Sequence, residues 1–174
     1  MYEPNVVGDW QEYEEHAGLR VRVHRLAAAE PPRGRDDAAA GLSYFTLRVT
    51  VENRGAQHYG IHLEDGQIDV RVGPDGEGAF IDWRSSQFIE GFDVYPLRRA
   101  TAVLYAAAPE AALSHVDVQV QLRVDEDWAD RRMWAGGIGV LEPSAPAAPA
   151  GTGQGSLAHQ VSAFLRDQTE PGTA

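Results

Sequence analysis

Alternation of apolar and polar residues is the dominant pattern in this chain, and it is clearest over residues 44–55. The apolar positions there are Phe45, Leu47, Val49 and Val51, and between them stand Tyr44, Thr46, Arg48, Thr50 and Glu52. A period of two predicts an antiparallel strand that buries the first set and exposes the second. The Asn53-Arg54-Gly55 sequence that follows predicts a turn.

Similar patterns predict further strands over residues 19–24, 67–72, 79–83, 98–106, 116–122 and 132–140. The Gly73-Pro74-Asp75-Gly76 turn predicts a hairpin between the second and third of these strands. Residues 27–40 contain two adjacent prolines and predict a flexible loop. About seven short strands, with no helical periodicity between them, predict an all-β antiparallel sandwich over residues 1–142.

The composition changes after residue 142. Residues 143–155 are rich in Pro and Ala and then in Gly, which predicts a flexible linker. Residues 156–168 predict a short amphipathic helix, capped by Ser156, whose apolar face carries Leu157, Val161, Phe164 and Leu165. Residues 169–174 are expected to be a disordered tail. Because so short a helix is unstable alone, its face is expected to pack on its own domain, a neighbouring subunit or a partner groove.

The order of these segments resembles a family of small bacterial immunoglobulin-like sandwiches of unknown function, often attached to secreted lipoproteins. The matching pieces span roughly residues 6 to 140: Val7-Gly8-Asp9, residues 19–23, residues 45–51 with Asn53-Arg54-Gly55, Asp75-Gly76, Val94-Tyr95-Pro96, residues 102–105 and Pro109. Pro96-Leu97 stands where the family usually has Pro-Gly, and the lipidated cysteine is missing. The resemblance implies an immunoglobulin-like sandwich of about seven strands used for binding or display, with no catalytic residues to transfer.

Net charge and composition argue against some classes of binding partner. The formal net charge of −11 argues against nucleic acid and acidic membranes, which bind clustered basic residues. All 15 basic residues are Arg, a composition typical of a high-GC bacterium such as an actinobacterium. The chain has no Cys, which excludes disulfides and thiolate metal sites. The first residues predict no signal peptide, so we expect a cytoplasmic protein if Met1 is the natural start and an extracellular one otherwise. No apolar run predicts membrane insertion.

No catalytic or phosphate-binding motif is present in the sequence, so we expect neither an enzyme nor a cofactor. His58 and His62 would lie about 13 Å apart on an extended strand, too far for one metal ion, and are interpreted as surface histidines. The acidic turn with Asp125, Glu126, Asp127 and Asp130 offers oxygen ligands that suit calcium. A solvated hairpin is the favoured interpretation of this turn, and no metal site is assigned.

Aromatic residues between 83 and 95 leave two alternatives open. Trp83, Phe88 and Phe92 fill the core in the favoured interpretation, and in the other they form an exposed platform for a partner or a sugar. Trp128 in the acidic turn is a further candidate anchor. We therefore predict a non-enzymatic protein-binding module, with Phe88, Phe92, Trp128 and the C-terminal helix as contacts. A carbohydrate- or calcium-binding sandwich is the alternative, and a homo-oligomer stays open.

Overall fold

The computed structural model of the chain describes residues 5–33 and 41–136. The predicted linker, C-terminal helix and tail lie outside these residues. Leu157, Val161, Phe164 and Leu165 therefore stay predictions. Within the described part, the protein is an antiparallel β-sandwich, as predicted.

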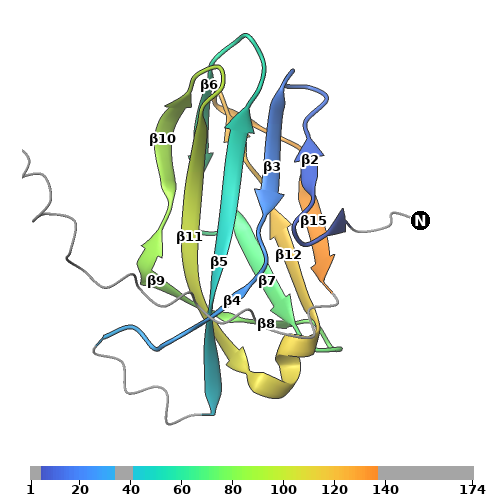
Figure 1. The fold of residues 1–174 in the computed structure, drawn as a ribbon, viewed down its shortest axis with the longest axis vertical. Helices are drawn as coiled ribbons and strands as arrows, with labels where there is room; N and C mark the ends of the chain where they lie inside the picture. Colours follow the sequence, from blue (N-terminus) through green and yellow to red (C-terminus); the bar gives the residue numbers. More distant parts are fainter. Residues whose placement is uncertain (1–4, 34–40, 137–174) are drawn as a thin grey trace, which may run out of the picture. The chain divides into compact units, whose positions relative to one another are not determined.

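One layer of the sandwich is a six-stranded sheet (Figure 1). In spatial order it contains β2 (Trp10–Glu12), β3 (Leu19–Val23), β5 (Leu42–Asn53), β11 (Arg99–Pro109) and β9 (Phe80–Gln87). The sixth strand, β4 (Ala27–Ala29), pairs with the first half of β5. Long β5 and β11 pair over eleven residues and form the centre of this layer.

The facing layer consists of two smaller sheets, and the chain passes from one sheet to the other between some consecutive strands. The five-stranded sheet has the order β1 (Asn5–Val6), β15 (Arg132–Gly136), β12 (Val116–Val120), β7 (Ile68–Val72) and β8 (Glu77–Gly78). The four-stranded sheet has the order β10 (Ile89–Val94), β6 (Tyr59–Leu63), β13 (Arg123–Val124) and β14 (Asp127–Trp128). A 3₁₀ helix, η2 (Glu110–Ser114), joins β11 to β12.

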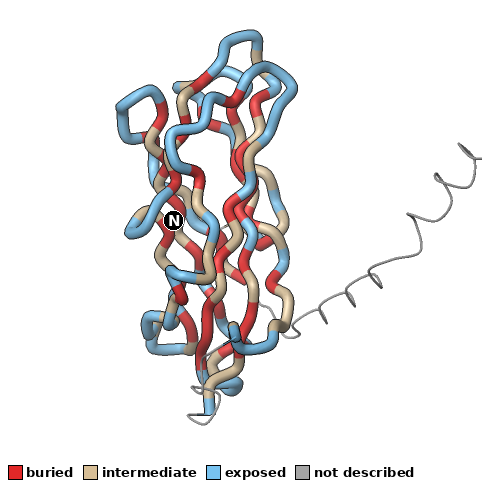
Figure 2. Tube along the Cα trace, turned by 90° about the vertical axis from the view of Figure 1, so that its left-hand side faces the viewer, coloured by how far each residue is buried: buried red, intermediate tan, exposed pale blue. Residues whose placement is uncertain are grey.

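The core lies between the layers, and Figure 2 shows buried positions along the strands with exposed turns at both ends. Phe45, Leu47, Val49 and Val51 are all fully buried, which confirms the alternation on which the fold prediction rests. Trp134 is also fully buried, and its Nε1 donates to the carbonyl oxygen of Asp9 at 3.0 Å. Hydrophobic side chains from both layers thus meet in one core.

Several predicted boundaries are wrong. Residues 27–29, predicted as loop, form β4 because they pair with β5. Tyr44, predicted to face solvent, is buried and stands opposite Ala29 of that added strand. The predicted hairpin partner of β7 is only the two-residue β8, because the chain crosses to the other layer at Phe80 and pairs with β11. Strands β6 and β10 were not predicted at all.

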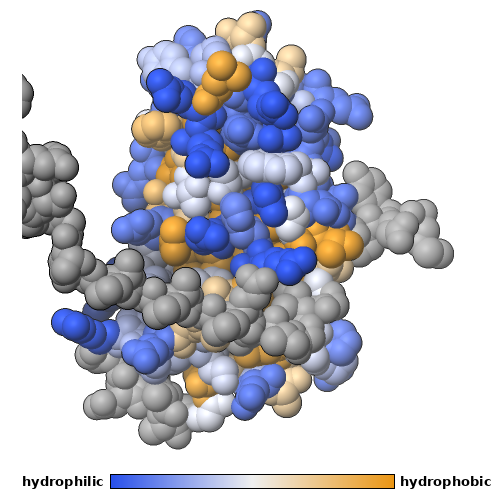
Figure 3. Space-filling view, in the orientation of Figure 1, coloured by the Kyte–Doolittle hydropathy of each residue, from blue (hydrophilic) through white to orange (hydrophobic). Residues whose placement is uncertain are grey.

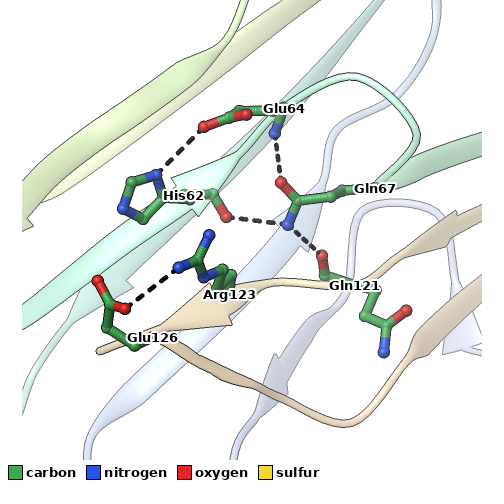
Figure 4. Close-up of polar contacts among 6 residues, drawn as sticks. All are labelled: His62, Glu64, Gln67, Gln121, Arg123 and Glu126. Atoms are coloured by element: carbon green, nitrogen blue, oxygen red, sulfur yellow. Dashed lines mark hydrogen bonds and ion pairs between the residues drawn. The ribbon is translucent and has the colours of Figure 1, made fainter.

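Short stretches without ladder pairing separate consecutive strands of the second layer. The side chain of Gln67 stabilises one such stretch (Figure 4). Its Oε1 accepts from the backbone N–H of Glu64 at 2.8 Å, and its Nε2 donates to the carbonyl oxygens of His62 at 3.2 Å and Gln121 at 2.8 Å. These bonds replace ladder hydrogen bonds where β6 gives way to β7 and β12 to β13. The predicted strand 116–122 for this reason ends at Val120, and β13 begins only at Arg123.

Among the described residues, no helix is long and apolar enough to cross a membrane.

Candidate functional site

An irregular stretch of β9 begins the candidate site. Tyr105 of β11 stands opposite Asp82, while Val103 stands opposite Gln87. Two steps along β11 therefore correspond to five along β9, so three extra residues bulge out of the strand. Bulges re-aim side chains at sheet edges and are often found beside binding sites.

Asp82 holds the bulge in shape. It is almost fully buried, and its Oδ1 accepts from the backbone N–H groups of Arg84 at 3.1 Å and Ser85 at 3.3 Å. Its Oδ2 accepts from the Ser85 hydroxyl at 3.2 Å. The Ser86 hydroxyl donates to the carbonyl oxygen of Asp82 at 2.7 Å and accepts from the backbone N–H of Tyr105 at 3.0 Å. The bulge is thus a hydrogen-bonded feature that carries Trp83 to the surface.

A groove opens where the chain leaves β9 for β10. β9 pairs with β11 only from Val103 onward, so among the described residues no strand pairs with residues 99–102 of β11 on this side. The resulting side groove has a volume of about 730 Å³. It is lined by Trp83, Ser86, Gln87, Phe88, Ile89, Glu90, Phe92, Ala100 and Thr101.

Three aromatic side chains surround the side groove. The rings of Trp83 and Phe88 lie 5.4 Å apart between centroids, and Trp83 is 38% exposed. Phe88 is half-buried and packs against the core, whereas Phe92 is 50% exposed. The favoured prediction that all three fill the core is therefore wrong for Trp83 and Phe92. Along the edge of the molecule that β9 and β10 form, apolar side chains reach the surface among polar ones (Figures 1 and 3).

A second bulge precedes Phe92 in β10. Ile89 stands opposite Leu63 and Phe92 opposite Ile61, so β10 has one residue more than β6 in this interval. Gly91 takes up the irregularity with a φ of +60°, a value that favours glycine. The extra residue moves Phe92 into the register of buried Ile61, and its ring is nevertheless 50% exposed because β10 is the edge strand of its sheet.

Trp128 lies at the other edge of the four-stranded sheet. It is 62% exposed on β14, whereas Phe92 is on β10, and β6 and β13 lie between them. The turn before Trp128 has positive φ at both Asp125 and Glu126, which is the requirement of a two-residue type I′ hairpin. The structure thus brings Phe88 and Phe92 to one groove and places Trp128 elsewhere.

The residues considered as metal ligands in the sequence contact different neighbours and are not grouped together. The ring of His58 stacks on Tyr95 with centroids 5.5 Å apart, and Nδ1 of His62 lies 3.2 Å from Oε1 of Glu64. Glu126 accepts from Arg123 at 3.3 Å (Figure 4). Within residues 5–33 and 41–136, no three His, Asp or Glu side chains are grouped closely enough to hold a metal ion.

A second groove, of about 710 Å³, also has Trp83 in its lining. It is lined in part by side chains with amide or charged groups, namely Gln67, Asp69, Arg84, Gln119, Gln121 and Arg131. Gln121 accepts through Oε1 from Arg131 at 3.2 Å. We call it the polar groove.

Sequence reasoning missed the bulge that positions Trp83, although a signal was present. The carboxylate of an Asp can accept hydrogen bonds from backbone N–H groups two and three residues later. A Ser three or four residues after the Asp can donate its hydroxyl to the Asp, and both kinds of bond are typical of a local turn. Residues 82–86 contain this pattern inside a stretch predicted only as a strand end.

Solved structures with the same fold are known, at low sequence identity. The ycdA protein of Bacillus subtilis, named as a candidate lipoprotein, aligns with a TM-score of 0.53 and 8% identity over 75% of this chain. This chain spans only 38% of that protein. The secreted protein MPT63 of Mycobacterium tuberculosis aligns with a TM-score of 0.46, 16% identity and coverage of 77% of this chain and 98% of its own.

An uncharacterised β-sandwich protein of Clostridium difficile 630 gives a TM-score of 0.43 and 11% identity, over 78% of this chain and 95% of its own. No family model matches the chain, and no curated protein matches its sequence. Similarities at this level of identity show the fold alone, because one fold serves many functions. Membership of the immunoglobulin-like family and the cellular location therefore stay predictions.

Proposed function

We propose that this protein is a non-enzymatic interaction module that binds a protein partner in the side groove between β9, β10 and β11. The observation that carries the proposal is the exposure of Trp83 and Phe92 around a groove whose floor includes an unpaired stretch of β11. Large aromatic side chains in a concave site are the most frequent anchors of protein interfaces. The predicted role of Phe88 and Phe92 as partner contacts is part of this proposal.

An extended peptide suits the groove in two ways. Backbone groups of residues 99–102 can pair with an added strand, and side chains of that strand can enter the apolar space beside Trp83 and Phe88. Trp83 is also preorganised, because the hydrogen bonds of Asp82 fix the bulge before any partner arrives. The cost of ordering the site on binding is thereby reduced.

The test is selection of a phage-displayed library of random twelve-residue peptides against the full chain. We expect enriched peptides that carry apolar residues at alternate positions and bind at least about tenfold more weakly to Trp83→Ser and Phe92→Ser variants. Trp128→Ser is the matched control, since it removes an exposed aromatic ring from the opposite edge of the sheet that carries Phe92. Peptides that bind all three variants equally, or no enrichment at all, would contradict the proposal.

The polar groove supports a second candidate function, which is carbohydrate binding. An aromatic face beside several amide and charged groups is an arrangement that can stack on a sugar ring and hydrogen-bond its hydroxyls, and Trp83, Gln119 and Asp69 line the same groove here. A glycan array with Trp83→Ser and Gln119→Ala as comparisons tests it. Glycan binding that both substitutions abolish would favour this candidate over the first.

A further inference from the structure

Three arginines stand on the outer surface of the six-stranded sheet. Arg22 of β3 is opposite Thr50 of β5, and Thr50 is opposite Thr101 of β11. Arg48 precedes Thr50 by two residues and Arg99 precedes Thr101 by two, so all three arginines share the outer face. Strand geometry puts the Cα atoms of Arg22 and Arg48 roughly 8 Å apart and those of Arg48 and Arg99 roughly 14 Å apart. We call this set the arginine face.

None of the three forms an ion pair within the described part of the chain. The carboxylate that lies in their midst, Glu52, is already engaged, because Nε of Arg20 donates to it at 2.6 Å. Arg22 lies beside the Trp10 ring at 5.7 Å, and its Nε is buried without a hydrogen-bond partner. Arg48 and Arg99 are exposed. Unpaired cations thus gather on one face of a protein whose net charge is −11.

A hydrogen-bonded row of side chains forms the floor between the arginines. Nε2 of His24 lies 2.8 Å from the hydroxyl of Thr50, which lies 2.9 Å from the hydroxyl of Thr101. Burial first, and then the charges of Arg48, Arg22 and Arg99, together lower the pKa of His24 to about 4. The positive potentials of the three guanidinium groups therefore converge on this floor.

Thr101 also lines the side groove, so the arginine face and the groove are neighbours on one surface. Figure 1 shows β3, β5 and β11 side by side, with β9 and β10 beyond β11. A chain segment that leaves the groove across β11 would reach Arg99 and Arg48 next.

We propose that the arginine face binds an acidic, extended segment of a protein partner through its Asp and Glu carboxylates. The inference rests on the proposed function as an interaction module and names the chemistry of the partner. Strand geometry places the three arginines at the corners of a triangle with Cα separations of roughly 8, 12 and 14 Å. Side chains two and four residues apart on an extended peptide lie roughly 7 and 13 Å apart, so carboxylates at alternate positions can reach more than one of these guanidinium groups. Guanidinium groups bind carboxylates through two parallel hydrogen bonds, which gives such pairing its specificity.

The probe is a fluorescein-labelled octapeptide of alternating Glu and Ser, compared with the Gln and Ser analogue by fluorescence anisotropy on the full chain. We expect saturable binding of the Glu peptide alone, weaker at 200 mM than at 50 mM NaCl. Arg48→Gln and Arg99→Gln should each weaken it about fivefold, because each removes one charge-assisted contact. Arg71→Gln removes an exposed arginine from the facing layer and should leave binding unchanged.

The NMR signal of the His24 ring reports whether the peptide sits on this face. A carboxylate near the arginines should raise the pKa of His24 above about 4, and in Arg48→Gln that response should require about fivefold more peptide. Binding that Arg48→Gln and Arg71→Gln weaken equally, or an unmoved His24 signal, would overturn the inference. Displacement of the peptide by millimolar sulfate at constant ionic strength would also overturn it, in favour of a small oxyanion.

The two proposals can fail separately. Trp83→Ser and Phe92→Ser leave the arginine face intact, so Glu-peptide binding that survives them supports the arginine face even if the library selection fails. Apolar peptides that need Trp83 but ignore Arg48→Gln, with no binding of the Glu peptide, support the groove and reject the acidic partner.

Discussion

Asn53 is the residue whose removal gives the sharpest test of the fold. It ends β5, is fully buried, and its Nδ2 donates to the carbonyl oxygens of Val94 at 2.8 Å and Gln57 at 2.5 Å. Its Oδ1 accepts from the backbone N–H of Gly55 at 2.8 Å. One side chain therefore fixes the turn after β5 and the end of β10, the strand that carries Phe92.

Asn53→Ala removes three hydrogen bonds, of which only the one to exposed Gln57 is readily replaced by water. The two remaining groups, on Val94 and Gly55, cost about 1–2 kcal/mol each when left without a partner. We expect a loss of about 3 kcal/mol in the free energy of unfolding, which corresponds to a melting temperature lower by roughly 10 °C. Urea titration followed by Trp fluorescence, with an unchanged m-value, is the appropriate measurement.

Asn53→Asp separates hydrogen bonding from turn propensity. Asp suits such a turn as well as Asn does, but it lacks the donor and places a carboxylate against the carbonyl oxygens of Val94 and Gln57. We expect it to be at least as unstable as Asn53→Ala at pH 7. An Asp variant as stable as the wild type would refute the reasoning, as would an Ala variant that loses less than about 1 kcal/mol.

Three further predictions concern the core and the sheet surface. The pKa of His24 is lowered to about 4, so the unfolded chain takes up a proton first as pH falls. The free energy of unfolding should therefore be full above about pH 6.5 and decline toward pH 4. The decline should be smaller in His24→Gln, and urea midpoints between about pH 4 and 8 measure it. Trp134→Phe should cost about 2 kcal/mol by calorimetry, because it loses a buried hydrogen bond and leaves a void. Gly18→Ala should yield little folded protein, since its Cβ would lie 2.2 Å from the backbone nitrogen of Gly55; Gly41→Ala, with open space around it, should cost only about 1 kcal/mol.

The sequence predicts the layers well where burial follows a strict alternation. Residues 116–120 alternate without interruption, and residues 45–51 do so except at Thr50, which is buried as well. Each segment pairs with a strand on both sides. Tyr59, Ile61 and Leu63 of β6 alternate equally well and are buried, so that strand was detectable, but Gly60 and His62 between them gave it the appearance of a loop.

The site was harder to predict for a physical reason. A bulge changes which face a side chain meets, and its position depends on the partner strand as well as on the bulged strand. Phe92 stands opposite buried Ile61 only because β10 gains a residue relative to β6, and it stays half exposed because β10 is an edge strand. Trp83 reaches the surface because Asp82 stabilises three extra residues relative to β11. The arginine face had a signal in alternating Arg20, Arg22, Arg48 and Thr50, yet only the register shows which arginine Glu52 neutralises.

The lengths of the edge strands are a further reason to propose binding at β9 and β10. The sheets end in six strands, of which β1, β8 and β14 have two residues each and β2 has three. Such short edges offer too few backbone groups for a partner strand and so resist unwanted pairing. β9 and β10 have eight and six residues, and both contain a bulge.

A bulge prevents a regular strand from pairing along the whole of a long edge. These edges are therefore protected against indiscriminate pairing while the groove beside β11 stays open. A partner would have to pair with residues 99–102 of β11, which β9 leaves unpaired, and place side chains beside Trp83. It would also have to be compatible with the positive charge of the arginine face around Thr101. Each requirement excludes some peptides, so the irregular edge that hides the proposed site from sequence analysis would also make that site selective.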